Sequence, residues 1–300
     1  MPPGLLGWGA LPLCLQTMSA TAAILLSIAL HVTWNLLARQ VPAQREFLWW
    51  ALAGHLLLVG PWAVAAMVLQ ARWDATLVSC IAVSGMALAA YFLALRTAYA
   101  HAPVALVYPI ARSSPLFIAL ASAVLFGERF SPAGVAGIAL SSAALVCLGA
   151  TAWRVDARRA ILPALAAAMG TTAYSLSDKM AVASLPGFAG QLGYISVGYL
   201  LAWIALTLRL RMETGLWRPR LLPPLGVLAL GSLSIGTAYA LVVHAMAELP
   251  AAYTVALSNG GIVIAALLSV FWFREMEHRR ARLFWAALLS IGLSLVALAD

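Results

Sequence analysis

Long apolar runs separated by short charged loops constrain this chain more than any other feature of its sequence. A run of about 20 apolar residues is long enough to cross the hydrocarbon core of a bilayer as an α-helix. Ten such runs follow one another, and the short loops between them carry most of the charge. We therefore predict an all-α membrane protein with ten transmembrane helices at 19–38, 46–69, 75–99, 103–126, 132–150, 160–181, 188–210, 221–244, 250–273 and 281–298.

The composition argues against a soluble protein. Hydrophobic residues make up 64% of the 300 residues and charged residues only 9%, whereas soluble domains have about 25% charged residues. The net charge of +8 does not indicate a nucleic-acid partner, because the basic residues lie between the apolar runs. The cysteines at 14, 80 and 147 lack the spacing of a metal site, so we expect no metal and no cofactor.

Residues 1–18 are apolar and precede the first predicted helix. Pro2, Pro3 and Pro12 interrupt this tail and no basic segment precedes it, which argues against a secretory signal. An interfacial tail and a start of translation at Met18 both stay open.

Basic residues are distributed unevenly between the two sides of the predicted membrane protein. One side holds 14 of the 18 Lys and Arg residues, and the positive-inside rule places that side in the cytoplasm and both termini outside. The opposite side holds Arg72, Arg129 and Lys179, and Arg112 lies inside a helix. The 14 are Arg39, Arg45, Arg96, Arg154, Arg158, Arg159, Arg209, Arg211, Arg218, Arg220, Arg274, Arg279, Arg280 and Arg282.

The two halves of the sequence resemble each other. When 102–129 is laid on 249–276 without a gap, Pro103 meets Pro250 and Glu128 meets Glu275. Each half has five helices, and an odd number means that the second copy is inverted. Inverted repeats are typical of secondary transporters, whose substrate sites lie near the midplane between the copies. The predicted domains are the tail at 1–18 and repeats at 19–150 and 160–298.

Several motifs together resemble the EamA type of the drug/metabolite transporter superfamily. The stretch LFGERFSP at 125–132 resembles the junction between the fourth and fifth helices of that family, and 94–109 is also similar. Phe273-Arg274-Glu275 diverges, because the family usually has a small residue before the Glu. The resemblance covers 19–298 and implies two inverted five-helix repeats and transport of a metabolite across the inner membrane. It also implies termini in the cytoplasm, the reverse of the charge distribution.

Arg112 is the most unusual residue within the predicted helices. A charge at the bilayer centre costs at least roughly 2.5–3.5 kcal/mol. Pro109 and Pro115 flank it and disturb the helix, and broken helices at this depth are tolerated where they line a wet cavity. The guanidinium fork suits a carboxylate or phosphate. We predict that Arg112 binds an anionic group of the substrate, with Tyr108 and Ser113 beside it; a structural arginine is the alternative.

Asn259 is the repeat equivalent of Arg112. It lies beside Ser258, and Gly260 and Gly261 after it loosen the helix or admit a close neighbour. We predict that Asn259 and Ser258 also line the substrate site. The alternative is a face of small residues that packs against another helix.

Two other predicted helices carry candidate wall residues. His31, Trp34 and Asn35 share one face of the first helix, because their spacings are three and four residues. Tyr174 of the sixth helix is equivalent to Trp34 in a weaker second match between the halves. We predict that these four residues line the cavity. Aromatic anchors at the membrane interface are the alternative for Trp34 and Tyr174.

Four charged residues near predicted helix ends are candidates for gating or coupling. They are Asp178, Arg96, Glu128 and Glu275. If transport is proton-coupled, Asp178 and His31 are the candidate proton carriers.

The expected function is secondary transport. The chain has no nucleophile elbow, zinc-protease motif or phosphate loop, so we predict no catalytic residue. We predict an exporter or exchanger of a small polar, anionic metabolite, such as an amino acid or organic acid, acting by alternating access as a monomer or homodimer. Two alternatives remain: an intramembrane enzyme using His31, His244 and Asp178, or a membrane sensor with a packed interior.

Overall fold

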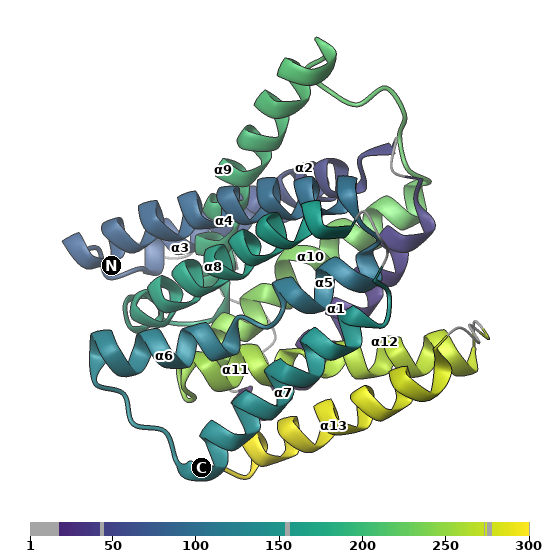
Figure 1. Ribbon diagram of the computed structural model, residues 1–300. Helices are drawn as coiled ribbons and strands as arrows, with labels where there is room; N and C mark the ends of the chain where they lie inside the picture. Colours follow the sequence, from purple (N-terminus) through teal and green to yellow (C-terminus); the bar gives the residue numbers. More distant parts are fainter. Residues whose placement is uncertain (1–17, 43–44, 154–156, 273, 275–277, 300) are drawn as a thin grey trace.

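The computed structural model describes residues 18–42, 45–153, 157–272, 274 and 278–299. Within these ranges the chain consists of α-helices and short connections, and no strand is present. The helices are α1 Ala20–Gln40, α2 Phe47–Leu58, α3 Gly60–Gln70, α4 Ala75–His101, α5 Val104–Ala111, α6 Pro115–Phe126, α7 Pro132–Ala150, α8 Arg158–Ala181, α9 Phe188–Thr214, α10 Leu225–Ala245, α11 Ala251–Ser258, α12 Gly260–Phe271 and α13 Arg279–Ala297 (Figure 1).

These helices make a multi-pass membrane protein. Nine stretches in the described part of the chain are long and apolar enough to cross a membrane, or ten if the pair α2 and α3, bent by 57°, forms one span. Two of the nine stretches are also interrupted near their centres, between α5 and α6 and between α11 and α12. Large apolar side chains such as Leu57 and Leu162 are more than 75% exposed, as expected for a surface covered by lipid. The predicted all-α membrane class is confirmed.

The spans begin and end close to the predicted residues. The largest shift is at the connection after the seventh span, where α9 continues to Thr214 and α10 starts at Leu225. In Figure 1, α9 extends beyond the rest of the bundle at the top. The predicted tail lies outside the described residues, except for Met18.

The motif at 125–132 forms a tight junction between α6 and α7. Gly127 ends α6 in the left-handed region, with a φ of 66°, where a residue without a Cβ is favoured. Ser131 caps α7 by accepting a hydrogen bond from the Gly134 amide (3.1 Å), and Pro132 occupies the first turn. Both devices are typical helix boundaries.

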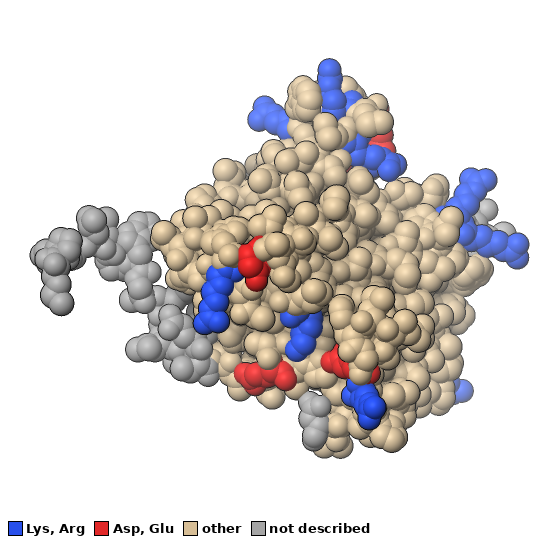
Figure 2. Space-filling model, turned by 90° about the vertical axis from the view of Figure 1, so that its left-hand side faces the viewer, with Lys and Arg blue, Asp and Glu red and all other residues tan. Residues whose placement is uncertain are grey.

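Polar contacts define the two ends of the bundle, which we call end A and end B. At end A, Arg45 of the connection before α2 donates to the Leu222 carbonyl before α10 (2.7 Å). At end B, Ser131 donates to the carbonyl of Ala299 after α13 (3.1 Å). End A lies toward the right of Figure 1 and end B toward the left. Figure 2 looks onto end B and shows a mostly tan face with a few scattered charged side chains.

The most extensive helix contacts join α4 to α8, α7 to α13, α1 to α10, α4 to α9 and α3 to α9. Helices α7 and α13 approach each other closely because each has a glycine that lies against the backbone of the other helix. A Cβ on Gly292 would lie 2.7 Å from the Ser141 nitrogen, and one on Gly137 would lie 2.7 Å from the Gly292 carbonyl oxygen. Small residues allow such close approach between membrane helices.

We expect Gly292→Ala to lower the free energy of unfolding by about 1–3 kcal/mol, because the added methyl group must push apart two backbones. Denaturant titration of the detergent-solubilised protein, followed by circular dichroism, measures this change. Gly226→Ala is the matched control, since nothing lies within 4 Å of its added Cβ. Equal stability of the two variants would contradict the close contact.

Candidate functional site

Two helix breaks face each other in the middle of the bundle. The first lies at 112–114 between α5 and α6, where Pro115 has no amide hydrogen to continue the helix. The second lies at Asn259 between α11 and α12. Because the two breaks face each other, the side chains at one break can bond to those at the other.

Arg112 joins the two breaks through three hydrogen bonds. Its Nε donates to Asn259 Oδ1 and its Nη2 donates to Ser258 Oγ, both at 2.7 Å. In return, Asn259 Nδ2 donates to the Arg112 carbonyl oxygen at 3.0 Å. All three residues are buried. The guanidinium therefore has fixed partners on one side and further N–H groups that these bonds do not use.

A cavity of about 410 Å³ reaches Arg112 from end A. Its wall combines a few polar side chains with aliphatic ones from α1, α5, α12 and neighbouring helices. Arg112 and Ser258 lie at its inner end, near the breaks, and Arg282 lies at its outer end, in the first turn of α13. The polar or ionisable lining residues are His31, Asn35, Tyr108, Arg112, Thr151, Ser258, Ser269 and Arg282.

α1 brings two of the predicted wall residues to this cavity. Asn35 Nδ2 donates to Tyr108 Oη (3.2 Å) and to the His31 carbonyl (2.7 Å), which joins α1 to α5. His31 Nδ1 lies 3.1 Å from Ser27 Oγ within its own helix. The structure thus brings His31, Asn35 and Tyr108 together with Arg112 and Ser258 around one cavity.

α1 reaches the second break because Gly261 leaves room for it. A Cβ on Gly261 would lie 3.2 Å from Val32 Cγ2 and 4.0 Å from His31 Cβ. The glycine pair after Asn259 therefore admits a close neighbour, which is one of the two roles that the sequence allowed.

Four other predicted site residues lie outside the cavity wall. Asn259 bonds to Arg112 behind the cavity, and Ser113 donates to the Ile110 carbonyl within its own turn (2.7 Å). Trp34 packs in the hydrophobic core, where its Nε1 has no hydrogen-bond partner among the described residues. Tyr174 packs edge to face on Tyr239, with ring centroids 5.1 Å apart.

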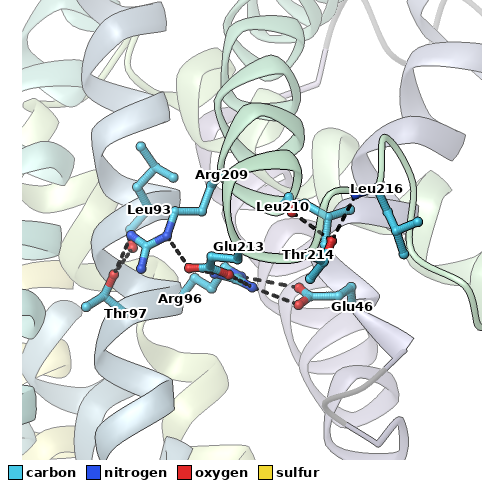
Figure 3. A network of polar contacts seen from close by, with 9 residues as sticks. All are labelled: Glu46, Leu93, Arg96, Thr97, Arg209, Leu210, Glu213, Thr214 and Leu216. Atoms are coloured by element: carbon cyan, nitrogen blue, oxygen red, sulfur yellow. Dashed lines mark hydrogen bonds and ion pairs between the residues drawn. The ribbon is translucent and has the colours of Figure 1, made fainter.

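Arg96 belongs to a network of ion pairs at end A. It bonds to Glu46 Oε1 and Glu213 Oε2, both at 2.9 Å, and Arg209 Nε donates to Glu213 Oε1 at 2.5 Å (Figure 3). The network joins the end of α4 to the start of α2 and the end of α9. These side chains are 24–39% exposed, and Arg96 does not line the cavity.

We expect Glu213→Gln to lower the free energy of unfolding by about 0.2–1 kcal/mol at low salt, because partly exposed ion pairs are screened by water. The difference from wild type should shrink in about 1 M salt, where the Debye length is about 3 Å. Denaturant titrations at both salt concentrations measure it. Glu248→Gln, an exposed acid at end B, is the control. A large, salt-independent loss in Glu213→Gln would contradict a screened network.

The other gating candidates lie at end B or outside the described residues. Asp178 is fully buried near the end of α8 and accepts hydrogen bonds from Tyr194 and Tyr239. Glu128 lies half-buried in the connection between α6 and α7. Glu275 lies outside the described residues.

The three residues of the enzyme alternative have separate partners. His31 bonds to Ser27, and Asp178 bonds to tyrosines of α9 and α10. His244 bonds to Gln191 Oε1 (2.9 Å) and the Met18 carbonyl (3.1 Å). Among the described residues, none of these three side chains bonds to another of them.

Sequence reasoning missed the outer part of the cavity. Arg282 donates to Ser269 Oγ (3.1 Å), and both line the cavity together with Thr151. Arg282 was counted only as one of several arginines in a basic loop, and the two hydroxyls carry no signal in an apolar helix. The glutamates that pair with Arg96 were also missed, because they come from distant segments.

Comparison with known proteins finds solved structures with the same fold, but it does not indicate an activity. No family model and no curated protein matches this chain. Among solved structures, 23 chains match. One of them, described only as "Crystal structure of protein", has a TM-score of 0.69 and 25% sequence identity, and the alignment covers 93% of this chain and 99% of that one. The chain therefore shares its fold over nearly its whole length with a protein of known structure.

Proposed function

We propose that this chain is a secondary transporter that carries a small polar anion, such as an amino acid or organic acid, across the cell inner membrane. The observation that carries this proposal is the placement of Arg112. Its guanidinium is held between two helix breaks at the inner end of a 410 Å³ cavity. Discontinuous helices at mid-membrane are a recurrent way to build substrate sites in transporters.

The cavity suits a small anion with an apolar part. Ligand pockets of small molecules are about 300–1,000 Å³ and combine apolar walls with a few polar groups. Here the aliphatic wall includes Val32, Leu36 and Ile262, and Arg112 supplies the cationic group. The free N–H groups of a fixed guanidinium can bind a carboxylate in a defined orientation.

The helix contacts support the proposed inverted repeats and the EamA-like architecture. If the spans are numbered from one to ten, α4 with α8 pairs the third and sixth spans, and α1 with α10 pairs the first and eighth. A two-fold relation between the halves exchanges these two contacts. The contact of α7 with α13 pairs the fifth and tenth spans, which the same relation leaves in place.

The cavity and the end-B contacts fit one state of an alternating-access cycle. The residues that line the cavity lie in the halves of their helices that are nearer to end A. At end B, Lys179 Nζ donates to the carbonyls of Met246 (2.6 Å) and Leu249 (3.0 Å) between α10 and α11. The positive-inside rule favours a cytoplasmic position for end A, which carries the basic loops, and in that orientation this state would be open to the cytoplasm.

Two observations favour transport over the alternatives. A sensor with a packed interior does not require the cavity at Arg112. An intramembrane enzyme would need its proton-transfer groups together, whereas His31, His244 and Asp178 have separate partners.

A flux screen tests the proposal. Proteoliposomes with wild-type protein, and protein-free liposomes, are compared for uptake and efflux of radiolabelled amino acids, organic acids and phosphorylated metabolites. We expect at least one anion to move only when the protein is present. If a folded, inserted sample moves none of the panel, the sensor interpretation replaces this proposal.

A further inference from the structure

Asp178 is a buried carboxyl group that has no cationic partner in the described part of the chain. It lies in the last turn of α8 and is 0% exposed. Its Oδ1 accepts a hydrogen bond from Tyr194 of α9 (2.8 Å), and its Oδ2 accepts one from Tyr239 of α10 (2.6 Å). Among the described residues, no Lys, Arg or His forms an ion pair with it. An ionisable group inside a membrane protein is costly, and such groups usually serve the pathway of a substrate or a proton.

The neighbouring Lys179 does not neutralise this carboxyl, because its ammonium donates to the Met246 and Leu249 carbonyls instead. Two consecutive residues of α8 therefore bind α9, α10 and the connection to α11. Both sets of bonds lie at end B, opposite the mouth of the cavity. They hold together the helix ends that must separate if the cavity is to open at end B.

The bonds of Asp178 depend on its protonation state. An ionised carboxylate only accepts hydrogen bonds, so it satisfies both tyrosine hydroxyls. When a proton binds, one oxygen becomes a donor and the charge-assisted bonds become neutral ones of roughly half the strength. Protonation therefore weakens the contact of α8 with α9 and α10.

The other titratable groups around Asp178 do not replace it as a proton site. Cys80 and Ser84 face it from α4, and Tyr174 lies one turn earlier on α8. Thiols, phenols and the Lys179 ammonium ordinarily lose their protons only above neutral pH, whereas carboxyl groups lose them below it. His244 of α10 also lies at end B and bonds to Gln191 and Met18. The carboxyl groups of Asp74, Glu128 and Glu248 at this end are not buried, so their protons exchange with water without breaking a buried contact.

We propose that Asp178 is a proton-binding site whose carboxylate form holds end B closed and whose protonated form releases it. A proton from the solution at end B binds one carboxylate oxygen, and no other covalent bond changes. Transport by this chain therefore responds to the pH at end B. This inference rests on the proposed transport function, and its first test needs no substrate.

Cys80 is a native reporter of opening at end B. It is buried on α4 beside the Asp178 contacts, and its carbonyl oxygen lies 3.2 Å from Tyr194 Oη. In a Cys14→Ser, Cys147→Ser background in nanodiscs, labelling of Cys80 by a water-soluble maleimide is followed at one pH. Asp178→Asn, which imitates the protonated form, should label about tenfold faster than the parent, the factor for losing a charge-assisted bond. Asp178→Glu should label at nearly the parent rate.

Tyr239→Phe makes this test independent of charge. This variant removes one hydrogen-bond donor and keeps the carboxylate. Faster labelling therefore cannot come from a change in the ionisation of the Cys80 thiol. If Asp178→Asn fails to fold, the labelling rate of Tyr239→Phe alone tests whether the carboxylate contact holds end B closed. Glu248→Gln, which neutralises an exposed acid at the same end, should label like the parent. If Asp178→Asn and Tyr239→Phe both label at the parent rate, the carboxylate does not hold end B closed.

A flux measurement separates this inference from the transport proposal. For an anion that the wild type moves, the initial rate should change with the pH at end B, and Asp178→Asn should lose that dependence while it still exchanges substrate across the membrane. His244→Gln should keep it. If wild type and Asp178→Asn share the same pH dependence, the proton site is wrong and transport stands. If no anion moves but Cys80 labelling responds as expected, transport is wrong and the Asp178 contact stands.

Discussion

Replacing Arg112 by lysine is expected to raise the KM for the transported anion by about 100-fold or more. Lysine keeps the charge, but one ammonium cannot bond to Asn259 and Ser258 and also present a planar pair of donors to the cavity. Loss of one partner of a buried charged contact costs about 2–5 kcal/mol, and about 2.7 kcal/mol corresponds to a factor of about 100 in affinity. The concentration dependence of the initial flux in proteoliposomes measures it.

Arg209→Lys is the matched control, because Arg209 lies in the end-A ion-pair network and does not line the cavity. Its KM should stay close to that of the wild type. An unchanged KM in Arg112→Lys, with protein folded and inserted to the same extent, would move the substrate site away from the helix breaks.

Replacing Asn259 by leucine is expected to lower the free energy of unfolding by about 3 kcal/mol, because it leaves a buried guanidinium without its Nε acceptor. The same change removes the amide that donates to the Arg112 carbonyl. Ser258→Ala removes a single bond to Nη2 and should cost less, about 1–2 kcal/mol. Denaturant titration of the detergent-solubilised protein measures both values.

Asn259→Asp provides the comparison for this prediction. The carboxylate still accepts from Nε and adds an opposite charge, so this variant should be more stable than Asn259→Leu. If Asn259→Leu is as stable as the wild type, the bonds between the two breaks do not contribute to stability in the way proposed here.

The spans and the breaks near Arg112 and Asn259 could be predicted from the sequence because each depends on local chemistry, whereas the 57° bend between α2 and α3 was not predicted. Runs of apolar residues set the length of a span, and Pro115 marks the first break since it has no amide hydrogen. Gly260 and Gly261 pointed to an irregular second span, and the break occurs one residue earlier, at Asn259. These signals need no knowledge of neighbouring helices.

The site itself could be predicted only in part. The repeat made Arg112 and Asn259 equivalent, but equivalence does not say that the two side chains bond to each other. That contact depends on how the α5–α6 and α11–α12 spans face each other. Trp34 shares a helix face with His31 within a few tens of degrees, yet it packs in the core while His31 lines the cavity. The spacing of residues predicts which side chains share one face of a helix. Only the packing of the helices determines which of those side chains line the cavity.

The network around Arg96 shows the same limit for charges. Glu46, Arg96 and Glu213 are far apart in the chain, and each alone looks like a helix-end charge of a membrane protein. They meet because the ends of α4 and α9 and the start of α2 lie side by side at end A (Figure 3). Counting the basic residues assigned Arg96 to one side of the membrane, and its pairing with the two glutamates depends on the fold.

Counterflow tests the central claim, carriage of an anion by alternating access at Arg112, most directly. Proteoliposomes are loaded with an unlabelled anion that the flux screen identifies, and a trace of the labelled anion is added outside. A carrier exchanges the two, so we predict that the label accumulates transiently above its outside concentration with wild-type protein. Arg112→Ala should abolish this accumulation. Label that only equilibrates in wild-type vesicles, or accumulation that Arg112→Ala preserves, would contradict the account.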